Sequence, residues 1–171
     1  MERVVQDVRS AVNGEAWYSA LALALALPDI CGYVESPRAG SGARYAAWFD
    51  REVGPCYSVS VAGSPPVQFL TGNDCYAMRC AFLHQGEFDI SDQRAREVLD
   101  RFRFVVPKSG VTIHNNRLKN TLQLQVSKFC EDVCVAVESW LVRARGRSDQ
   151  MQRLAQLASI EFLEYGNQKW P

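Results

Sequence analysis

The chain has 171 residues, of which 47% are apolar, so residues 1–171 can form one domain with its own hydrophobic core. Its 19 basic and 19 acidic side chains balance, which argues against both a disordered chain and a protein that binds nucleic acid through bulk positive charge. Any contact with nucleic acid is therefore expected to be local.

The first two helices are expected over residues 2–12 and 15–27. The first repeats apolar side chains at helical spacing and stops near Asn13-Gly14. The second is apolar nearly all round, so it belongs in the core, and Pro28 is expected to end it. Its apolar run is too short to span a bilayer and lacks the short basic start of a signal peptide, so no membrane partner is expected.

A flexible loop, residues 37–42, leads into a third helix over residues 43–53. This helix is expected to pack through three aromatic side chains, Tyr45, Trp48 and Phe49. The loop lacks the Gly-Lys-Ser/Thr ending of a phosphate-binding loop. Its flanking arginines, Arg38 and Arg44, are nevertheless weak candidates for a phosphate contact.

The clearest helix signals lie between residues 71 and 86. Thr71 followed by Asp74 predicts an N-cap with an acidic residue in the first turn. Gly86 predicts the C-terminal stop. A fourth helix is therefore expected over residues 72–85, and Ser91 is expected to cap a short helix that ends at Leu99.

The apolar period then changes from helical to alternating. Residues 102–106 and 121–126 are typical of strands, with a turn at Asn115-Asn116 or Lys119-Asn120. The insertion, about residues 102–126, is expected to form a small antiparallel β element before the last two helices. The predicted fold class is thus mainly α, a helical bundle of about five or six helices.

The last two helices are expected to begin at Ser127 and Ser148, with Gly146 between them. The first carries an apolar stripe made of Phe129, Val133, Val137, Trp140 and Leu141. The second is expected to face inward through Leu154, Ala158, Phe162 and Tyr165.

Six cysteines lie mostly among apolar neighbours: Cys31, Cys56, Cys75, Cys80, Cys130 and Cys134. Six free thiols and a cytoplasmic location are therefore expected. Cys130 and Cys134 could ligate zinc with His114, but a structural zinc site needs four ligands and no second pair is visible. Core packing of both cysteines is expected, with no metal and no other cofactor.

Arg79 and His84 form the best candidate for a catalytic site. A charge among Met78, Ala81 and Phe82 needs a partner or an opening to solvent. His84 falls in the last helical turn, where the negative end of the helix dipole favours a protonated imidazole. An arginine and a protonatable histidine together can bind a phosphodiester, stabilise charge on its oxygens and move a proton.

The pair resembles the signature of the HEPN superfamily (higher eukaryotes and prokaryotes nucleotide-binding domains): arginine, a gap of four to six residues, then histidine near a helix end. Here the gap between Arg79 and His84 is four residues. The resemblance implies a homodimer that cleaves RNA without a metal, and the expected function is a HEPN-like ribonuclease or RNA-binding protein of a toxin or phage-defence type. It also implies that His84 handles protons while Arg79 stabilises the pentacovalent phosphorane formed when a ribose 2′-hydroxyl attacks.

Two alternatives remain open at this point. Arg79 could be paired with an acidic residue while His84 caps carbonyls at the surface, in a non-catalytic protein-interaction module that dimerises through apolar helices. The densest positive patch of the sequence is a solvated helix end or a weak RNA-docking surface, formed by Arg143, Arg145, Arg147 and Arg153.

Overall fold

The computed structural model describes residues 1–60, 62–108 and 110–160. Six α-helices occur in these residues: α1 (Glu2–Asn13), α2 (Trp17–Glu35), α3 (Ser41–Glu52), α4 (Gly72–Gln85), α5 (Val126–Ala144) and α6 (Ser148–Ala155). The remaining elements are η1 (Gly54–Tyr57), β1 (Ser58–Val59), β2 (Val67–Gln68), β3 (Arg101–Val105), β4 (Asn116–Leu118) and β5 (Thr121–Gln125). The predicted mainly α fold with a small β element is confirmed.

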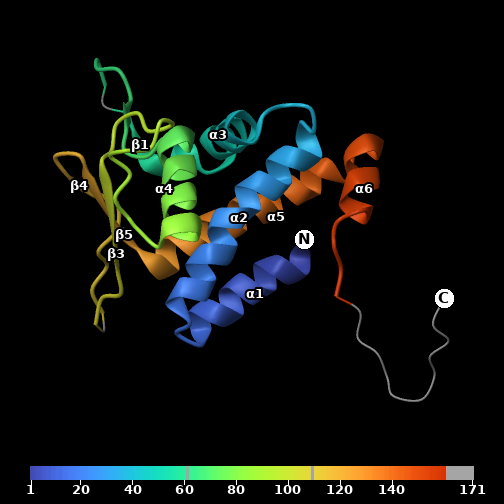
Figure 1. Cartoon of the computed structure of the whole chain (residues 1–171), viewed down its shortest axis with the longest axis horizontal. Coiled ribbons are helices and arrows are strands. Elements are labelled where there is room, and N and C mark those ends of the chain that lie inside the picture. Colours follow the sequence, from blue (N-terminus) through green and yellow to red (C-terminus); the bar gives the residue numbers. More distant parts are fainter. Residues whose placement is uncertain (61, 109, 161–171) are drawn as a thin grey trace.

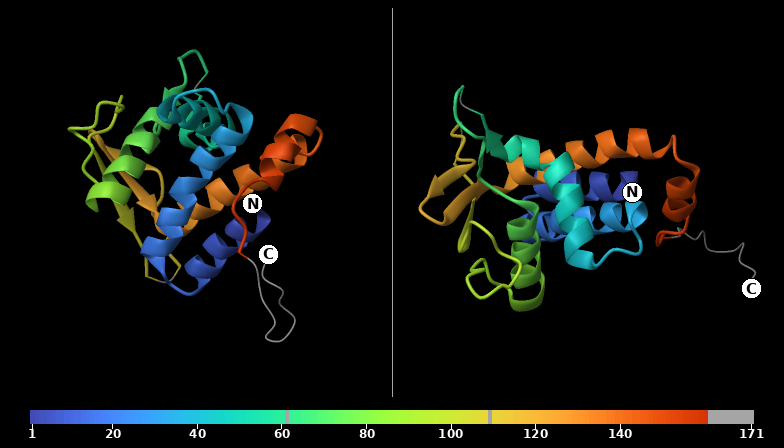
Figure 2. Two further views of the ribbon diagram at one scale, coloured as in Figure 1. Left: turned by 45° about the vertical axis from the view of Figure 1, so that its right-hand side comes forward. Right: turned by 90° about the horizontal axis from the view of Figure 1, so that it is seen from above.

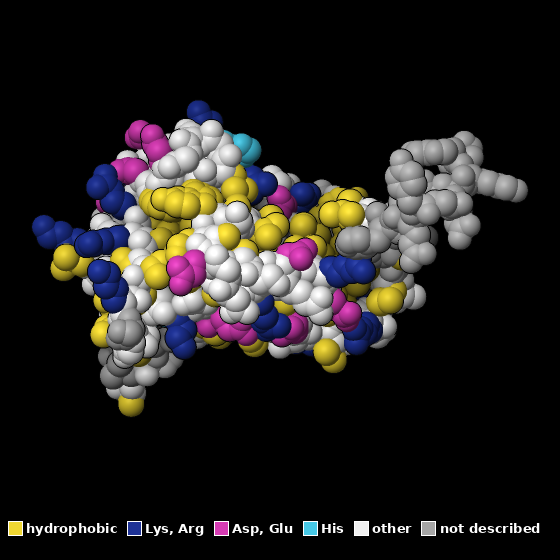
Figure 3. Space-filling model, turned by 90° about the horizontal axis from the view of Figure 1, so that it is seen from below, with side chains coloured by type: hydrophobic (Ala, Val, Ile, Leu, Met, Phe, Trp, Pro, Cys, Tyr) yellow, Lys and Arg dark blue, Asp and Glu magenta, His cyan; other side chains and the backbone are white. Residues whose placement is uncertain are grey.

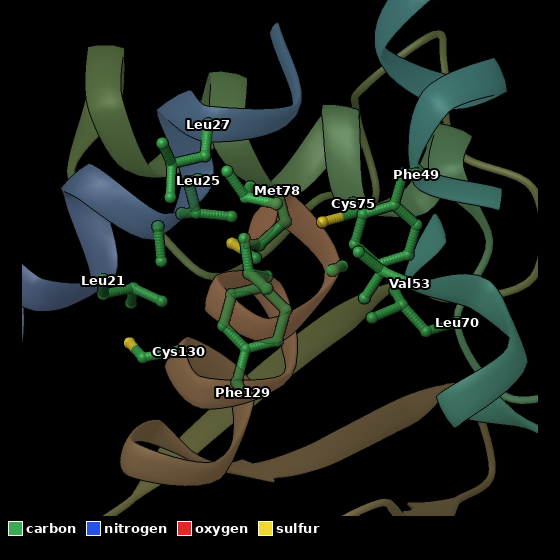
Figure 4. Close-up of a cluster of buried hydrophobic side chains, with 14 of the residues drawn as sticks. Leu21, Leu25, Leu27, Phe49, Val53, Leu70, Cys75, Met78, Phe129 and Cys130 are labelled. Atoms are coloured by element: carbon green, nitrogen blue, oxygen red, sulfur yellow. The ribbon is translucent and has the colours of Figure 1, made fainter. Parts of the chain in front are cut away.

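Helix α2 lies at the centre of the bundle, with α1, α3, α4 and α5 packed around it (Figure 1). The small sheet and α6 lie at opposite ends of the molecule (Figure 2). The core contains the expected aromatic residues of α3 and the whole predicted stripe of α5. Figure 4 shows how Leu25 of α2, Met78 of α4 and Phe129 of α5 meet in this core. The apolar spacing of α5 therefore identified its buried face.

The prediction that Pro28 ends the second helix is wrong, because α2 continues to Glu35. A proline inside a helix removes one backbone hydrogen bond. Here the loss is offset by tertiary packing, since Leu25 and Cys31 on either side of Pro28 are fully buried. At this length α2 has the size and composition of a membrane-spanning helix, yet half of its most apolar window is buried inside the protein.

The β element stands where it was predicted, but its main sheet is mixed. The strand order is β3-β5-β4, with β4 and β5 antiparallel around the Lys119-Asn120 turn. Strand β3 instead runs parallel to β5, with Arg101 opposite Thr121. A separate antiparallel pair joins β1 to β2. Leu122 and Leu124 of β5 are buried, so the sheet packs one face onto the helical core.

Two predicted N-caps are wrong. Residues 91–99 form turns instead of a helix, because the Ser91 hydroxyl and amide both donate to Asp89 within a local turn. Helix α5 begins at Val126, so Ser127 lies inside its first turn, where its hydroxyl accepts from the side-chain Nε2 of Gln125. Helix α6 begins at Ser148 as predicted and Leu154 packs against the core, but Ala158 follows the helix and is exposed. Phe162 and Tyr165 lie outside the described residues.

Two glycines let helices approach closely enough to form the candidate site. A Cβ on Gly32 of α2 would lie 2.7 Å from the Arg44 carbonyl oxygen of α3. A Cβ on Gly72 of α4 would lie 2.4 Å from the Ala46 carbonyl oxygen, which also belongs to α3. Neither position accommodates a side chain without moving a backbone. Glycine at both positions therefore holds α3 against α2 and α4.

Candidate active site

Helix α4 carries the Arg79–His84 pair, and its boundaries are those predicted. The Thr71 hydroxyl accepts a hydrogen bond from the Asp74 amide at 3.1 Å, which caps the helix. Gly86 ends it in the left-handed conformation at φ +74°. Asp74 is fully buried and also accepts from the backbone amides of residues 97, 98 and 99. Asp74 thereby fixes the start of α4 to the loop before β3. The sequence indicated only its role in capping the helix.

Arg79 and His84 contact each other. Five residues along a helix rotate the side chain by about 140°, so the two do not share a face. The arginine side chain nevertheless reaches the imidazole, with Nη1 3.4 Å from Nε2 of His84. Because a guanidinium only donates hydrogen bonds, Nε2 is the acceptor and the histidine proton is assigned to Nδ1. His84 is exposed, whereas the Arg79 side chain is only 22% exposed.

Asp29 of α2 pairs with Arg79 and is the residue that sequence reasoning missed. Its Oδ2 accepts from Arg79 Nη2 at 3.4 Å, and its Oδ1 accepts from Arg44 Nε at 3.2 Å and Nη2 at 3.1 Å. Asp29, Arg44, Arg79 and His84 are called the Asp29 cluster below. A signal was present, since Asp29 is the only charged residue between positions 16 and 34. A lone carboxylate in an apolar helix requires a cation from a neighbouring helix.

The cluster carries more positive charge than negative. Two guanidinium groups share one carboxylate, which leaves one positive charge in excess when His84 is neutral. Arg44 is held further by the Ala39 carbonyl at 3.3 Å and by the ring of Tyr33, 5.3 Å from its guanidinium carbon. The Arg79 Nε is buried and has no hydrogen-bond partner among the residues that the structure describes. The partly buried guanidinium groups, next to the exposed imidazole of His84, could pair with a phosphodiester.

The other predicted phosphate-binding arginines lie outside the cluster. Arg143 pairs with Glu52, Arg145 with Glu2 and Arg153 with Asp149, so three of the four arginines in the dense patch of the sequence are engaged in separate ion pairs. Arg38 and Arg147 are exposed and make no ion pair within the described residues. Of the five weak candidates, only Arg44 is brought into contact with Asp29.

His114 is a structural residue and not part of a surface turn. Its Nδ1 accepts from the Gln125 amide at 3.2 Å, and its Nε2 lies 3.3 Å from the Asp132 carboxylate, which also accepts from Tyr57 at 2.8 Å. Both ring nitrogens are therefore engaged. The side chain is only 16% exposed, so this histidine joins the β4 region to α5.

All six cysteines are free thiols, and Cys130 and Cys134 lie in the core as predicted. In the part of the chain that the structure describes, no three histidine, cysteine or acidic residues are grouped as metal ligands. Comparison with known proteins found no matching family model, curated protein or solved structure.

Proposed function

We propose that the chain is a metal-independent endoribonuclease in which Arg79 and His84 act on an RNA phosphodiester. The observation that carries the proposal is the contact between the partly buried Arg79 guanidinium and the Nε2 of the exposed His84, in a cluster with an excess of positive charge. A neutral imidazole whose Nε2 accepts a hydrogen bond is ready to act as a base. The HEPN resemblance of the same two residues supports the same reaction.

In the proposed reaction, His84 removes the proton of a ribose 2′-hydroxyl as that oxygen attacks the adjacent phosphorus. The bond from phosphorus to the 5′-oxygen breaks, and the leaving oxygen takes a proton from the protonated histidine of the second subunit. Arg79 stabilises the charge on the non-bridging oxygens of the phosphorane. The products are a 2′,3′-cyclic phosphate and a free 5′-hydroxyl. In the proposed complex, Arg44, which shares Asp29 with Arg79, would bind a neighbouring phosphate.

The proposed homodimer has a surface available beside the site. The aromatic patch consists of Tyr18, Phe82, Leu83 and Phe88, with the Tyr18 side chain 74% exposed and stacked on Phe82 at 6.4 Å. Apolar side chains gather on the face shown in Figure 3. Exposed apolar patches commonly mark protein interfaces. The patch also favours the second candidate function, a non-catalytic dimerisation module.

Cleavage of labelled single-stranded RNA in EDTA tests the proposal. The wild-type protein should produce 2′,3′-cyclic phosphate ends and leave DNA intact, because DNA lacks the attacking hydroxyl. His84→Ala should lower the rate about a hundredfold or more through loss of proton transfer. Arg79→Lys retains the charge but loses the planar fork, and should also be severely impaired.

Matched variants separate this activity from contamination and misfolding. Gln85→Ala changes the neighbouring residue of α4, and Arg103→Lys changes an exposed arginine of β3, so both should cleave like the wild type. Equal cleavage by wild type and His84→Ala would mean a contaminating nuclease. Light scattering should report about twice the 19.2 kDa chain mass. A dimer that cleaves none of several RNAs would establish the dimerisation module instead.

A further inference from the structure

Positive charge is concentrated in the part of the chain that forms the main sheet. Residues 101–130 contain six of the 19 basic residues and none of the 19 acidic ones, so the rest of the chain has an acidic excess of six. Strands β3, β4 and β5 and the first turn of α5 lie in this range. Lysine and arginine side chains gather at the left end of Figure 3, the end where Figure 1 shows the sheet. This end of a chain without net charge is therefore basic.

Most of these charges have no acidic partner. Arg101 pairs with Asp89 at 2.5 Å, whereas Arg117 donates only to backbone carbonyl groups. The basic sheet surface consists of the other four, which are exposed and make no ion pair within the described residues: Arg103, Lys108, Lys119 and Lys128. Uncompensated charges of one sign produce a potential that attracts a polyanion.

Two of these lysines lie at the two ends of β5. Lys119 is in the turn that precedes the strand, and Lys128 is in the first turn of α5, which follows it. That first turn contains no acidic residue. Because the N-terminal end of a helix carries partial positive charge, the helix dipole adds to the charge of Lys128. Positive potential thus extends along the whole of β5.

The face of the sheet that points away from the core is polar. Leu122 and Leu124 of β5 are buried, so Gln123 between them lies on the opposite face. The register places Arg103 of β3 and Asn116 of β4 on either side of Gln123. Neither amide side chain is engaged in a hydrogen bond within the described part of the chain. A cation beside two open amides can bind the phosphate and sugar groups of a nucleic acid.

We propose that the basic sheet surface binds the sugar-phosphate backbone of single-stranded RNA. Its charges are spread over β3, the turn between β4 and β5 and the start of α5 instead of converging in one cavity. This distribution suits a ligand that carries a phosphate in every repeating unit. The choice of RNA over an acidic protein rests on the proposed function.

The sheet is a neighbour of the helix that carries the proposed active site. Phe82 of α4 stacks on Phe88 at 5.3 Å, and Phe88 contacts Phe104 of β3 at 5.2 Å. An RNA strand bound at His84 can therefore continue toward the sheet. An anionic membrane is a poorer match, because an interfacial anchor inserts an apolar face. Among the described residues of β3, β4 and β5, Leu118 is the one large apolar side chain that is exposed.

Fluorescence anisotropy with a labelled single-stranded 2′-O-methyl RNA tests the proposal, because this RNA lacks the attacking hydroxyl and is not cleaved by the proposed reaction. Saturable binding that weakens with salt is expected. Lys119→Glu combined with Lys128→Glu should weaken binding at least about tenfold and lower the slope of its logarithmic salt dependence by about 1.4, since two phosphate contacts are lost. Thermal melting checks that the variant folds. Replacing both lysines by glutamine instead should give a smaller loss in the same direction.

The matched control is Arg38→Glu combined with Arg147→Glu. These arginines are exposed beside α6, at the end of the molecule remote from the sheet, and their reversal makes the same change in net charge. The control should bind RNA nearly as tightly as the wild type. Arg103→Lys should also bind like the wild type, because lysine keeps the positive charge.

The results that would overturn the proposal differ from those that bear on cleavage. Equal weakening by the two double glutamate variants would mean that binding follows net charge alone. Lysine-dependent binding to phosphatidylserine vesicles that exceeds RNA binding would assign the surface to a membrane, and equally strong competition by polyglutamate would assign it to an acidic protein. Absence of RNA binding at low salt would also overturn it. Binding of the modified RNA without cleavage of ordinary RNA would overturn the proposed function alone.

Discussion

At the residue scale, Asp29 pairs with two arginines, Arg44 and Arg79. Removing its carboxylate is therefore expected to destabilise the fold more than removing one of the two guanidinium groups. Asp29→Ala would leave Arg44 and Arg79 facing each other without a counter-ion. Arg44→Met retains the Asp29–Arg79 pair and most of the apolar stem. Because these side chains are about one-fifth exposed, Asp29→Ala is expected to lower the free energy of unfolding by only about 1–2 kcal/mol, below the range for a buried pair.

Urea denaturation of both variants measures this difference, and Arg44→Met should be affected less. A larger loss in Arg44→Met than in Asp29→Ala would contradict the shared-carboxylate arrangement. Low salt strengthens the comparison, since partly exposed ion pairs are screened at high ionic strength.

A second prediction at the residue scale concerns His114, whose replacement is expected to lower the stability of the protein without lowering RNA cleavage. His114→Ala removes the partner of the Gln125 amide and one partner of Asp132. The free energy of unfolding should fall by about 1–3 kcal/mol, because partly buried polar groups lose their hydrogen bonds. Thermal melting measures the loss. RNA cleavage well below the melting transition should match the wild type, and a selective loss of cleavage would place His114 in the chemistry.

At the scale of elements, the close approach of α3 and α4 places Arg44 beside the Arg79 helix. Gly72→Ala would push its Cβ into the Ala46 carbonyl, so the two helices must separate. A loss of about 1–3 kcal/mol in stability is expected from this overpacking. Gly40→Ala is the matched control, since a Cβ at Gly40 meets nothing within 4 Å and its φ of −59° is ordinary. Equal denaturation midpoints for the two variants would show that α3 and α4 can adjust freely.

At the scale of the whole molecule, the six thiols are expected to differ in reactivity because they differ in burial. Burial raises the pKa of Cys75 and Cys130 to about 12 and that of Cys134 to about 11. Cys56 is the one exposed cysteine. Because the thiolate is the reactive form, alkylation of the native protein at pH 8 should modify Cys56 first and leave the buried thiols protected. Mass spectrometry counts the adducts.

Alkylation of denatured, unreduced protein supplies the control and should modify all six cysteines. A protected pair that persists after denaturation would indicate a disulfide and contradict the free-thiol assignment. Rapid labelling of Cys75 in the native state would mean that the core opens readily.

The sequence by itself determined the features whose causes lie within a few residues. Thr71 and Gly86 specified both ends of α4, because a cap satisfies backbone groups of its own helix turn. The apolar spacing of α5 identified its buried face for the same local reason. The need of Arg79 for a partner was also readable, since a charge in an apolar helix must be compensated.

Only the tertiary structure decided which partners meet. Asp29 lies fifty positions before Arg79, and no local rule pairs two residues that become neighbours only when α2 and α4 pack. The same holds for β3, which pairs directly and in parallel with β5 although β4 lies between them in the sequence. It also holds for Pro28, whose helix continues because its flanking residues are buried. Local hydrogen bonding sets the ends of elements, whereas burial of apolar surface, which acts between distant segments, sets which elements and side chains come together.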